Sequence, residues 1–272
     1  MPNTCARWAK PYTVTVRLLF VGDVFGAPGM RVARRFLRAV REEYDFVIVN
    51  GENAAGGFGI TRKHFWQLRE AGADVVTLGN HGWDQAEALQ LVEETPHLLR
   101  PLNYPPGTPG LGSGTFTART GERVTVAQIM GRILMEPLLD DPFRAIDVLL
   151  AEERDHSVVV DFHAEATSEK KVMGYHLAGR CSALLGTHTH VQTADETILS
   201  GTGYITDVGM TGVQNSSIGM NFEEVHFRFT TGLPKRYRPA DQPGEVRAVA
   251  LVLEGGKTKS IRRVRWGPDG KD

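Results

Sequence analysis

Five short apolar runs in this chain end in the same way, and this shared ending constrains the fold more than any other feature. After each run, side chains of the kind that bind metal ions follow almost at once. The runs are Arg17–Val21, Phe46–Val49, Val75–Leu78, Val158–Val160 and Ser182–Leu185. Their apolar character, with helical patterns between them, predicts buried strands of a parallel sheet.

Eight side chains that can contribute to a metal site follow these runs. They are Asp23, Glu52, Asn53, Asn80, His81, His163, His188 and His190. Because sites in open α/β sheets form at the carboxyl ends of strands, we expect all eight at one edge of a single sheet. A mixed set of oxygen and nitrogen atoms suits a pair of divalent metal ions.

Taken singly, most of these residues have ordinary structural explanations. A lone aspartate such as Asp23 commonly caps a helix, and Asn80 suits a tight turn. Glu52 is harder to explain in this way, and its two carboxylate oxygens make it the candidate to bridge two cations. His188 and His190 lie two residues apart, so they point to the same side of an extended segment. The joint occurrence of all eight residues at strand ends is what favours a metal site.

The strand ends also resemble known motifs. Gly22-Asp23, Gly79-Asn80-His81 and Thr187-His188-Thr189-His190 resemble the GD, GNH and G(H)xH motifs of calcineurin-like metallophosphoesterases. The strings 51–57, 160–169 and 206–212 are similar to the YmdB-like subfamily of bacterial phosphodiesterases. This resemblance runs from about Val16 to near the C-terminus. It implies an α/β fold in which two mixed β-sheets pack together and are flanked by helices.

The resemblance further implies a role for each residue of the site. One metal ion would take Asp23, Glu52, Asn53 and His190, and the other would take Glu52, Asn80, His163 and His188. Glu52 would bridge the two ions, of which iron is favoured and manganese or zinc are alternatives. A hydroxide shared by the metals would attack phosphorus, and His81 would bind no metal but protonate the leaving oxygen as general acid.

Three positions depart from the broader superfamily. Phe25 stands where a histidine is usual and Glu52 where an aspartate is usual, although both match the subfamily. Gly82 follows His81 where an acidic residue is common. Another carboxylate must then orient His81, and the candidates are Asp84 and Asp161.

The resemblance implies a small phosphodiester substrate, a cyclic nucleotide and above all a 2′,3′-cyclic one. The glycine-rich loop 56–59 either closes over a phosphate through its N–H groups or only lets the bridging glutamate sit correctly. Three aromatic residues either stack on a base or pack internally. They are Phe25, Phe58 and Trp83.

Two other functions stay open at this point. The first is a broader phosphomonoesterase or nucleotidase with the same metals, which would need cations for a dianionic substrate. Only Arg100, Arg132 and Arg180 are candidates for such a pocket, and none adjoins a ligand motif. The second is a regulatory module that binds RNA or a protein and uses metals only for structure. A complete set of ligands argues against that second alternative.

Composition limits the remaining classes. The 31 basic and 32 acidic residues nearly cancel, which argues against duplex nucleic acid as a partner. No apolar run approaches the roughly 20 residues of a membrane span, and residues 1–11 are no signal peptide. Cys5 and Cys181 are expected as free thiols, and the protein as cytoplasmic. A homo-oligomer is left open.

The expected organisation is one domain over residues 16–272, preceded by an extension of residues 1–15. Helices are expected at about Arg31–Tyr44, between Thr61 and Gly72, at Ala86–Glu94 after an Asp84 cap, from Pro142 to about Glu153, and from a Ser168 cap to about Leu177. The remaining strands are expected at Gly114–Arg119 and Arg123–Gln128 as a hairpin, and at Tyr204–Thr206, Arg247–Leu253 and Ser260–Val264 in a mostly antiparallel sheet.

Overall fold

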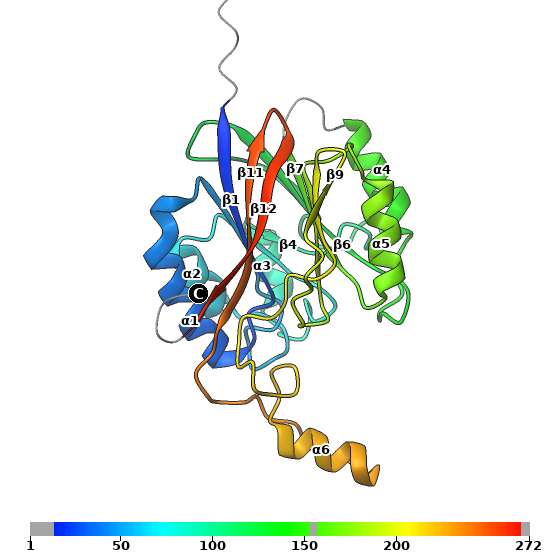
Figure 1. Cartoon of the computed structure of the whole chain (residues 1–272). Helices are drawn as coiled ribbons and strands as arrows, with labels where there is room; N and C mark the ends of the chain where they lie inside the picture. The colour runs from blue at the N-terminus through cyan, green and yellow to red at the C-terminus, as the bar shows by residue number, and fades with distance from the viewer. Residues whose placement is uncertain (1–13, 153–156, 268–272) are drawn as a thin grey trace, which may run out of the picture.

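The first strand, β1 (Thr15–Val21), packs on both of its faces. Leu18 and Phe20 belong to a cluster between two sheets, whereas Leu19 and Val21 belong to a cluster under helices. Strands buried on both sides are typical of parallel sheets with both faces covered. The computed structural model, which describes residues 14–152 and 157–267, is built in this way: two six-stranded sheets lie together with helices outside (Figure 1).

The first sheet has the strand order β12-β11-β1-β2-β3-β4. Parallel to β1 run β2 (Phe46–Asn50), β3 (Val75–Thr77) and β4 (Leu98–Leu99). Antiparallel to it lies β11 (Val246–Glu254), which pairs with β12 (Lys257–Trp266). The outer face carries α1 (Gly26–Val40) and α2 (Arg62–Ala71), while α3 (Ala88–Glu94) leads into β4.

The second sheet has the order β5-β6-β7-β8-β10-β9. Its central strands are parallel: β6 (Arg123–Met130), β7 (Ser157–His163), β8 (Ala183–Thr187) and β10 (Thr202–Ile205). The edge strands β5 (Ser113–Thr117) and β9 (Thr197–Leu199) are antiparallel to their neighbours. Its outer face is covered by α4 (Pro142–Glu152) and α5 (Thr167–His176).

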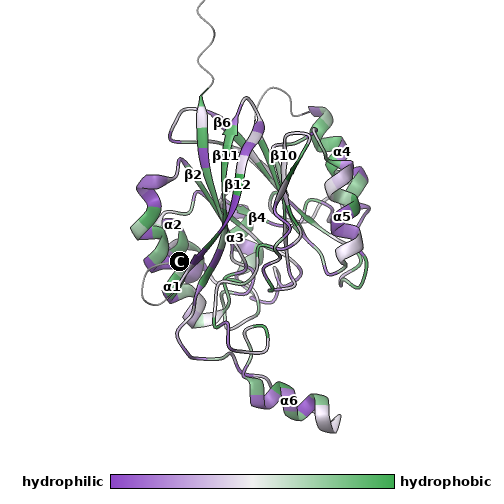
Figure 2. Cartoon of the chain, in the orientation of Figure 1, coloured by the Kyte–Doolittle hydropathy of each residue, from purple (hydrophilic) through white to green (hydrophobic). Residues whose placement is uncertain are grey.

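The last helix, α6 (Phe222–Thr231), projects away from both sheets, at the bottom of Figure 1. Figure 2 shows hydrophobic and hydrophilic residues side by side along it. Two of its phenylalanines are largely exposed, Phe222 at 63% and Phe229 at 78%. Asn221 begins the helix by accepting the N–H of Glu223, and Gly232 ends it in the left-handed conformation.

The predicted fold class is confirmed, but the prediction that all site residues follow strands of one sheet is wrong. Asp23, Glu52 and Asn80 follow strands of the first sheet, whereas His163 and His188 follow strands of the second. The reason is the antiparallel hairpin β5–β6, which opens a new sheet in mid-chain. In the sequence, the pattern of alternating strands and helices is the same whether the strands form one sheet or two.

Several predicted helix boundaries are confirmed and others are wrong. Thr61 caps α2 and Gly72 ends it, and the predicted hairpin is present. The first helix begins at Gly26 instead of Arg31, because a proline in the first turn needs no N–H donor. It ends at Val40, and residues 41–43 form one 3₁₀ turn.

Two predicted caps are also wrong. Asp84 does not cap α3, which begins only at Ala88, because the Asp84 carboxylate is held by His81. Ser168 lies inside α5, one residue after its start.

Some predictions fall outside the described residues. Residues 1–13 and Cys5 are among these, so the proposed N-terminal extension stays a prediction, although β1 already begins at Thr15. Cys181 is buried as a free thiol, as predicted. Within residues 14–152 and 157–267, no helix combines the length and apolar character needed to cross a membrane.

Candidate metal centre

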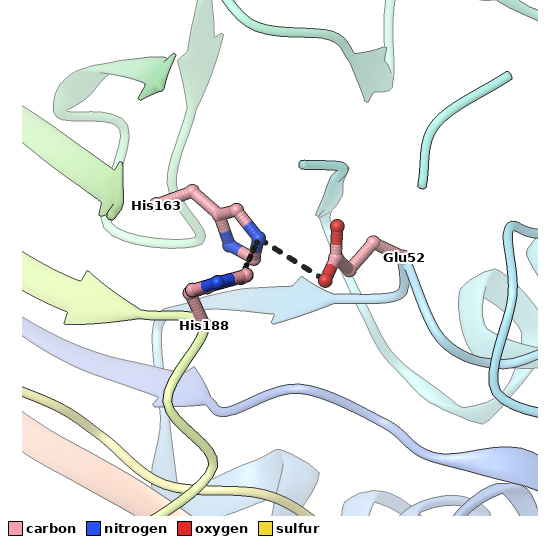
Figure 3. Close-up of side chains that lie close together, drawn as sticks. All are labelled: Glu52, His163 and His188. Atoms are coloured by element: carbon pink, nitrogen blue, oxygen red, sulfur yellow. Dashed lines mark hydrogen bonds and ion pairs between the residues drawn. The ribbon is translucent and has the colours of Figure 1, made fainter. Parts of the chain in front are cut away.

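Side chains from both sheets meet at one point between the carboxyl ends of their strands. Figure 3 shows three of them: Glu52 after β2, His163 at the end of β7 and His188 after β8. One ligand atom from each lies within 4.8 Å of the other two. Oε1 of Glu52 lies 3.1 Å from Nε2 of His163, and Nδ1 of His188 lies 3.1 Å from that same nitrogen. The structure thus brings these three predicted ligands together.

Hydrogen bonds on the far side of each ring determine which nitrogen faces this point. Nδ1 of His163 lies 2.9 Å from Oγ1 of Thr187, whose own proton is donated to Asp161 at 2.7 Å. His163 therefore donates from Nδ1 and keeps the lone pair of Nε2 for the centre. Nε2 of His188 lies 3.2 Å from a carboxylate oxygen of Glu165, so Nδ1 of His188 also faces inward as an acceptor.

Once Nε2 of His163 has lost its proton, the atoms that face inward are all acceptors. Oδ1 of Asn80 lies 2.9 Å from Nε2 of His163, in addition to the Glu52 and His188 atoms. Lone pairs that face one another at this distance are unfavourable unless a proton or a cation lies between them. A metal ion with imidazole, amide and carboxylate ligands satisfies all four atoms.

A second pair of acceptor atoms that face each other lies between Asn53 and His190. Nδ1 of His190 donates to the carbonyl oxygen of Ile218 at 3.0 Å, and Nδ2 of Asn53 donates to that of Gly57 at 2.9 Å. The remaining atoms, Nε2 of His190 and Oδ1 of Asn53, face each other at 3.2 Å as two acceptors. Oδ1 of Asp23 is also buried, and among the described residues it has no hydrogen-bond partner. These atoms fit a cation as well.

The charges of the centre follow from burial and from close neighbours. Burial alone lowers the pKa of His163, but the Glu52 carboxylate outweighs it and raises that pKa to about 9. Burial, reinforced by the charge of His163, lowers the pKa of His188 to about 3. Burial raises the pKa of Asp23 well above its ordinary value. The protein groups alone thus leave a proton on His163 to balance Glu52, and a metal ion would displace that proton.

Gly79 makes this meeting of side chains feasible. A Cβ atom at this position would lie 2.2 Å from Oε2 of Glu52 and 2.4 Å from Nε2 of His163. Any side chain here would occupy the place where the ligand atoms converge. This explains in physical terms why a glycine precedes Asn80 at the end of β3.

His81 stands beside the centre with its ring partly exposed. Nδ1 lies 2.7 Å from Oδ2 of Asp84, and the backbone N–H donates to Oε2 of Glu52 at 3.3 Å. Asp84 is therefore the carboxylate that orients His81, and the alternative prediction of Asp161 is wrong. Asp161 lies behind the ligands instead, where it accepts the proton of Thr187.

A cavity of about 390 Å³ opens onto the centre. Glu52, Asn53, His81, His188 and His190 line it on the inner side. The outer wall is mainly apolar and comes from the segment 217–237, which includes α6.

The aromatic residues predicted to stack on a base divide into two groups. Phe25 and Phe58 line the cavity, whereas Trp83 packs edge-on against Tyr104. Phe58 also meets His81 edge-on, with ring centres 5.1 Å apart. In the glycine-rich loop, a Cβ at Gly57 would lie 2.6 Å from the Phe25 ring, which supports a packing role for this glycine.

The sequence alone does not reveal the residues that hold the candidate ligands in place. Nζ of the buried Lys170 donates to the carbonyl oxygen of Thr187 and to Oδ2 of Asp207, each at 2.7 Å. Asp207 in turn accepts from the N–H and the hydroxyl of Thr189, between the two histidines of the HxH motif. The strings 160–169 and 206–212 carry the family resemblance, but that resemblance assigns these supporting residues no role.

Known proteins are similar to this chain over most of its length. Residues 19–264 match the family model described as YmdB-like protein. The 2′,3′-cyclic-nucleotide 2′-phosphodiesterase of Bacillus subtilis (strain 168) is 44% identical over 252 residues, which cover 91% of this chain and 95% of that protein.

Two solved structures are also similar. A hypothetical protein from Thermus thermophilus has a TM-score of 0.88 and 50% identity, covering 92% of this chain and 99% of the other. A phosphatase of Mycoplasma pneumoniae has a TM-score of 0.88 and 32% identity, covering 94% of each chain.

The two packed sheets with their ligand-rich strand ends define a calcineurin-like metallophosphoesterase fold. More narrowly, this chain belongs to the YmdB-like family, as the motifs had predicted. That family implies divalent metal ions, and the cluster of Glu52, His163 and His188 is a place that can hold one.

Proposed function

We propose that this chain is a phosphodiesterase that holds two metal ions and hydrolyses 2′,3′-cyclic nucleotides. The broader enzyme class, a hydrolase of phosphoric diesters, was predicted from the sequence and is confirmed by the relatives' names. The observation that carries the proposal is the set of facing acceptor atoms beside a cavity sized for one small ligand. A cytoplasmic location stays a prediction, and the oligomeric state stays open.

In this proposal each metal ion has its own set of ligands. Asp23, Asn53 and His190 would hold one, Asn80, His163 and His188 would hold the other, and Glu52 would contribute to both. The facing acceptors of Asn53 and His190 support the first set, and those around His163 support the second. When bound, two such ions lower the pKa of a water molecule and polarise phosphate oxygens. Iron is the favoured metal, with manganese or zinc as alternatives.

The chain itself supplies a proton for the leaving oxygen. His81 lines the cavity, and Asp84 holds its Nδ1, so Nε2 is the nitrogen that can give a proton to the leaving oxygen. In a cyclic diester this oxygen stays attached to the ribose and therefore close to His81. The outer wall of the cavity, which includes Phe229, is mainly apolar.

The lining of the cavity favours a diester over a monoester. Among the described residues, no lysine or arginine lines it. Arg100 donates to carbonyl oxygens of residues 101, 108 and 109, and Arg180 pairs with Asp147. Among the residues that line the cavity, a dianionic monoester would thus find no cationic side chain, whereas a cyclic diester carries a single negative charge.

Product analysis tests the proposal. Metal-loaded protein is incubated with 2′,3′-cyclic AMP and, separately, with 2′-AMP and 3′-AMP. We expect ring opening to be faster than release of free phosphate. Faster release of free phosphate from the monophosphates than ring opening of the cyclic ester would favour the nucleotidase alternative. A protein that holds its metal ions but hydrolyses none of these substrates would favour the regulatory module.

A further inference from the structure

A groove of basic character adjoins the cavity of the metal centre. Its volume is about 950 Å³, more than twice the 390 Å³ of the cavity. Phe58 and Tyr237 line both hollows, so the two share a wall. A cavity of the smaller size suits one small ligand, and the groove extends this space outward.

Four basic residues line the groove. They are Arg228, Lys235, Arg236 and Arg238. Among the described residues of its lining, Glu224 alone is acidic, and its carboxylate is already paired with Arg238. The whole chain has a net charge of only −1, so this positive charge is a local concentration. Such a groove attracts an anion with several charges, not a neutral ligand.

Aromatic rings lie among these charges. Phe58 and Tyr237 line the groove, and the guanidinium of Arg228 lies 5.3 Å from the ring centre of Tyr237. Figure 1 shows the helix α6, which carries Arg228 and Phe227, projecting beyond the strands. Cations that follow a backbone of phosphates, with rings on which bases stack, are the general design of sites for single-stranded nucleic acid.

We propose that this groove binds the nucleotides preceding a 2′,3′-cyclic phosphate at the 3′ end of a single-stranded RNA. The inference rests on the proposed function, because the cyclic phosphate itself must occupy the metal centre. The shared wall of Phe58 and Tyr237 places the preceding phosphates next to Lys235 and Arg236. The lack of a chain-wide positive charge agrees with a single strand as ligand instead of a duplex.

The chemistry of the substrate also points to RNA. A 2′,3′-cyclic phosphate forms when a ribose 2′-hydroxyl attacks the neighbouring phosphodiester and the 5′-oxygen leaves, so RNA strand cleavage is the class of reaction that supplies it. Hydrolysis then adds one water molecule and breaks one ring P–O bond. The freed ribose oxygen takes a proton, and a phosphomonoester remains at the RNA end.

The test compares substrate lengths in a groove variant. Lys235→Gln/Arg236→Gln is assayed with an RNA hexamer that ends in a 2′,3′-cyclic phosphate and with the matching cyclic mononucleotide. For the wild type at low salt we expect a kcat/KM roughly tenfold higher on the hexamer. The variant should lose most of this gain and keep its rate on the mononucleotide. The slope of its logarithmic salt dependence should fall by about 1.4, since each lost cation contributes about 0.7.

A matched control removes the same charge elsewhere. Arg38→Gln/Lys259→Gln changes exposed residues on α1 and β12 that line neither hollow, and it should keep the gain on the hexamer. Equal kcat/KM on both substrate lengths, or equal loss in both variants, would overturn the inference and leave the proposed function standing. If polyglutamate inhibited hydrolysis of the hexamer as strongly as an unreactive RNA of the same length, the groove would be a general anion-binding surface. This result would also overturn the inference.

A failure of the proposed function gives a different result. In that case neither the mononucleotide nor the hexamer is hydrolysed. Fluorescence anisotropy with a labelled hexamer then still decides the question of the groove. Weaker binding by the groove variant alone supports it, and unchanged binding contradicts it.

Discussion

The inner and the outer side of the cavity are built in different ways. The inner side consists of ligand atoms at the ends of β2, β7 and β8, fixed by buried hydrogen bonds such as those of Asp161 and Lys170. The outer side consists of a loop and of α6, two of whose phenylalanines are largely exposed. The inner side can therefore hold ions at fixed positions, whereas the outer side can adapt to what the ions bind.

This difference separates chemistry from selection of the substrate. Strand ends buried among polar partners have little freedom, which suits atoms that must stay within a few tenths of an ångström. A helix with few buried contacts opens at low free-energy cost and suits contacts with variable ligands. Changes on the inner side should therefore act on kcat and metal content, and changes on the outer side on KM.

The largest effect is expected for Glu52→Gln. Both proposed metal positions lose their shared ligand charge, so we expect turnover to fall by roughly 10⁴-fold or more and metal content to drop well below two ions per chain. Elemental analysis and a cyclic-nucleotide assay measure the two effects. Glu165→Gln is the matched control, because Glu165 bonds only the outer nitrogen of His188, and it should cost about tenfold. Full metal content and activity in Glu52→Gln would refute the bridging role.

The next largest effect is expected for His81→Ala. Loss of a general acid should lower kcat by about 10²–10⁴-fold while metal content stays near that of the wild type. The loss should be smaller for a nitrophenyl ester, whose leaving group needs no proton. His176→Ala removes a histidine that is also paired with an aspartate, Asp147, but lies outside the cavity, and it should change nothing. Loss of metal in His81→Ala would instead make His81 a ligand.

The sequence predicts the inner side far better than the outer side. Asp23, Glu52 and His163 follow apolar runs closely, and such a pattern can be recognised within a short stretch of sequence. No local pattern shows that two sheets share the site. This arrangement arises because the hairpin β5–β6 begins a second sheet and does not pair with the sheet of β1.

Contacts between distant residues explain the other omissions. Lys170 lies mid-helix and looks like an exposed lysine, and only the tertiary structure places its ammonium against Asp207. Nothing in the string 222–238 reveals that it lines a cavity opposite Glu52, since that depends on where α6 projects from the two sheets.

A third prediction concerns the buried support of the inner side. Lys170→Met leaves the Asp207 carboxylate buried without its cationic partner, and we expect a loss of about 3–5 kcal/mol in the free energy of unfolding. Urea unfolding measures it. Lys171→Met removes the adjacent lysine, whose pair with Asp195 is partly exposed, and it should cost at most about 1 kcal/mol. Equal losses in the two variants would contradict the distinction between buried and exposed pairs.

A fourth prediction concerns pH and metal affinity. The Glu52 carboxylate raises the pKa of His163 to about 9, so below that pH a metal ion must displace a proton before Nε2 can bind it. Apparent affinity should therefore rise with pH, by up to about tenfold per unit, and level off near pH 9. Titration of metal-free protein at several pH values measures this. An affinity independent of pH between 7 and 9 would show that His163 is not a ligand.

The smallest effect is expected on the outer side. Phe229→Ala removes an exposed ring from the wall of the cavity, and we expect KM for the cyclic nucleotide to rise about fivefold with kcat unchanged, because a base that stacks on the ring loses only binding energy. Phe222→Ala removes a similarly exposed ring of the same helix that does not line the cavity, so KM should stay the same. A fall in kcat for Phe229→Ala would mean that the outer wall also helps to position the reacting phosphate. The outer side would then act on kcat as well as on KM.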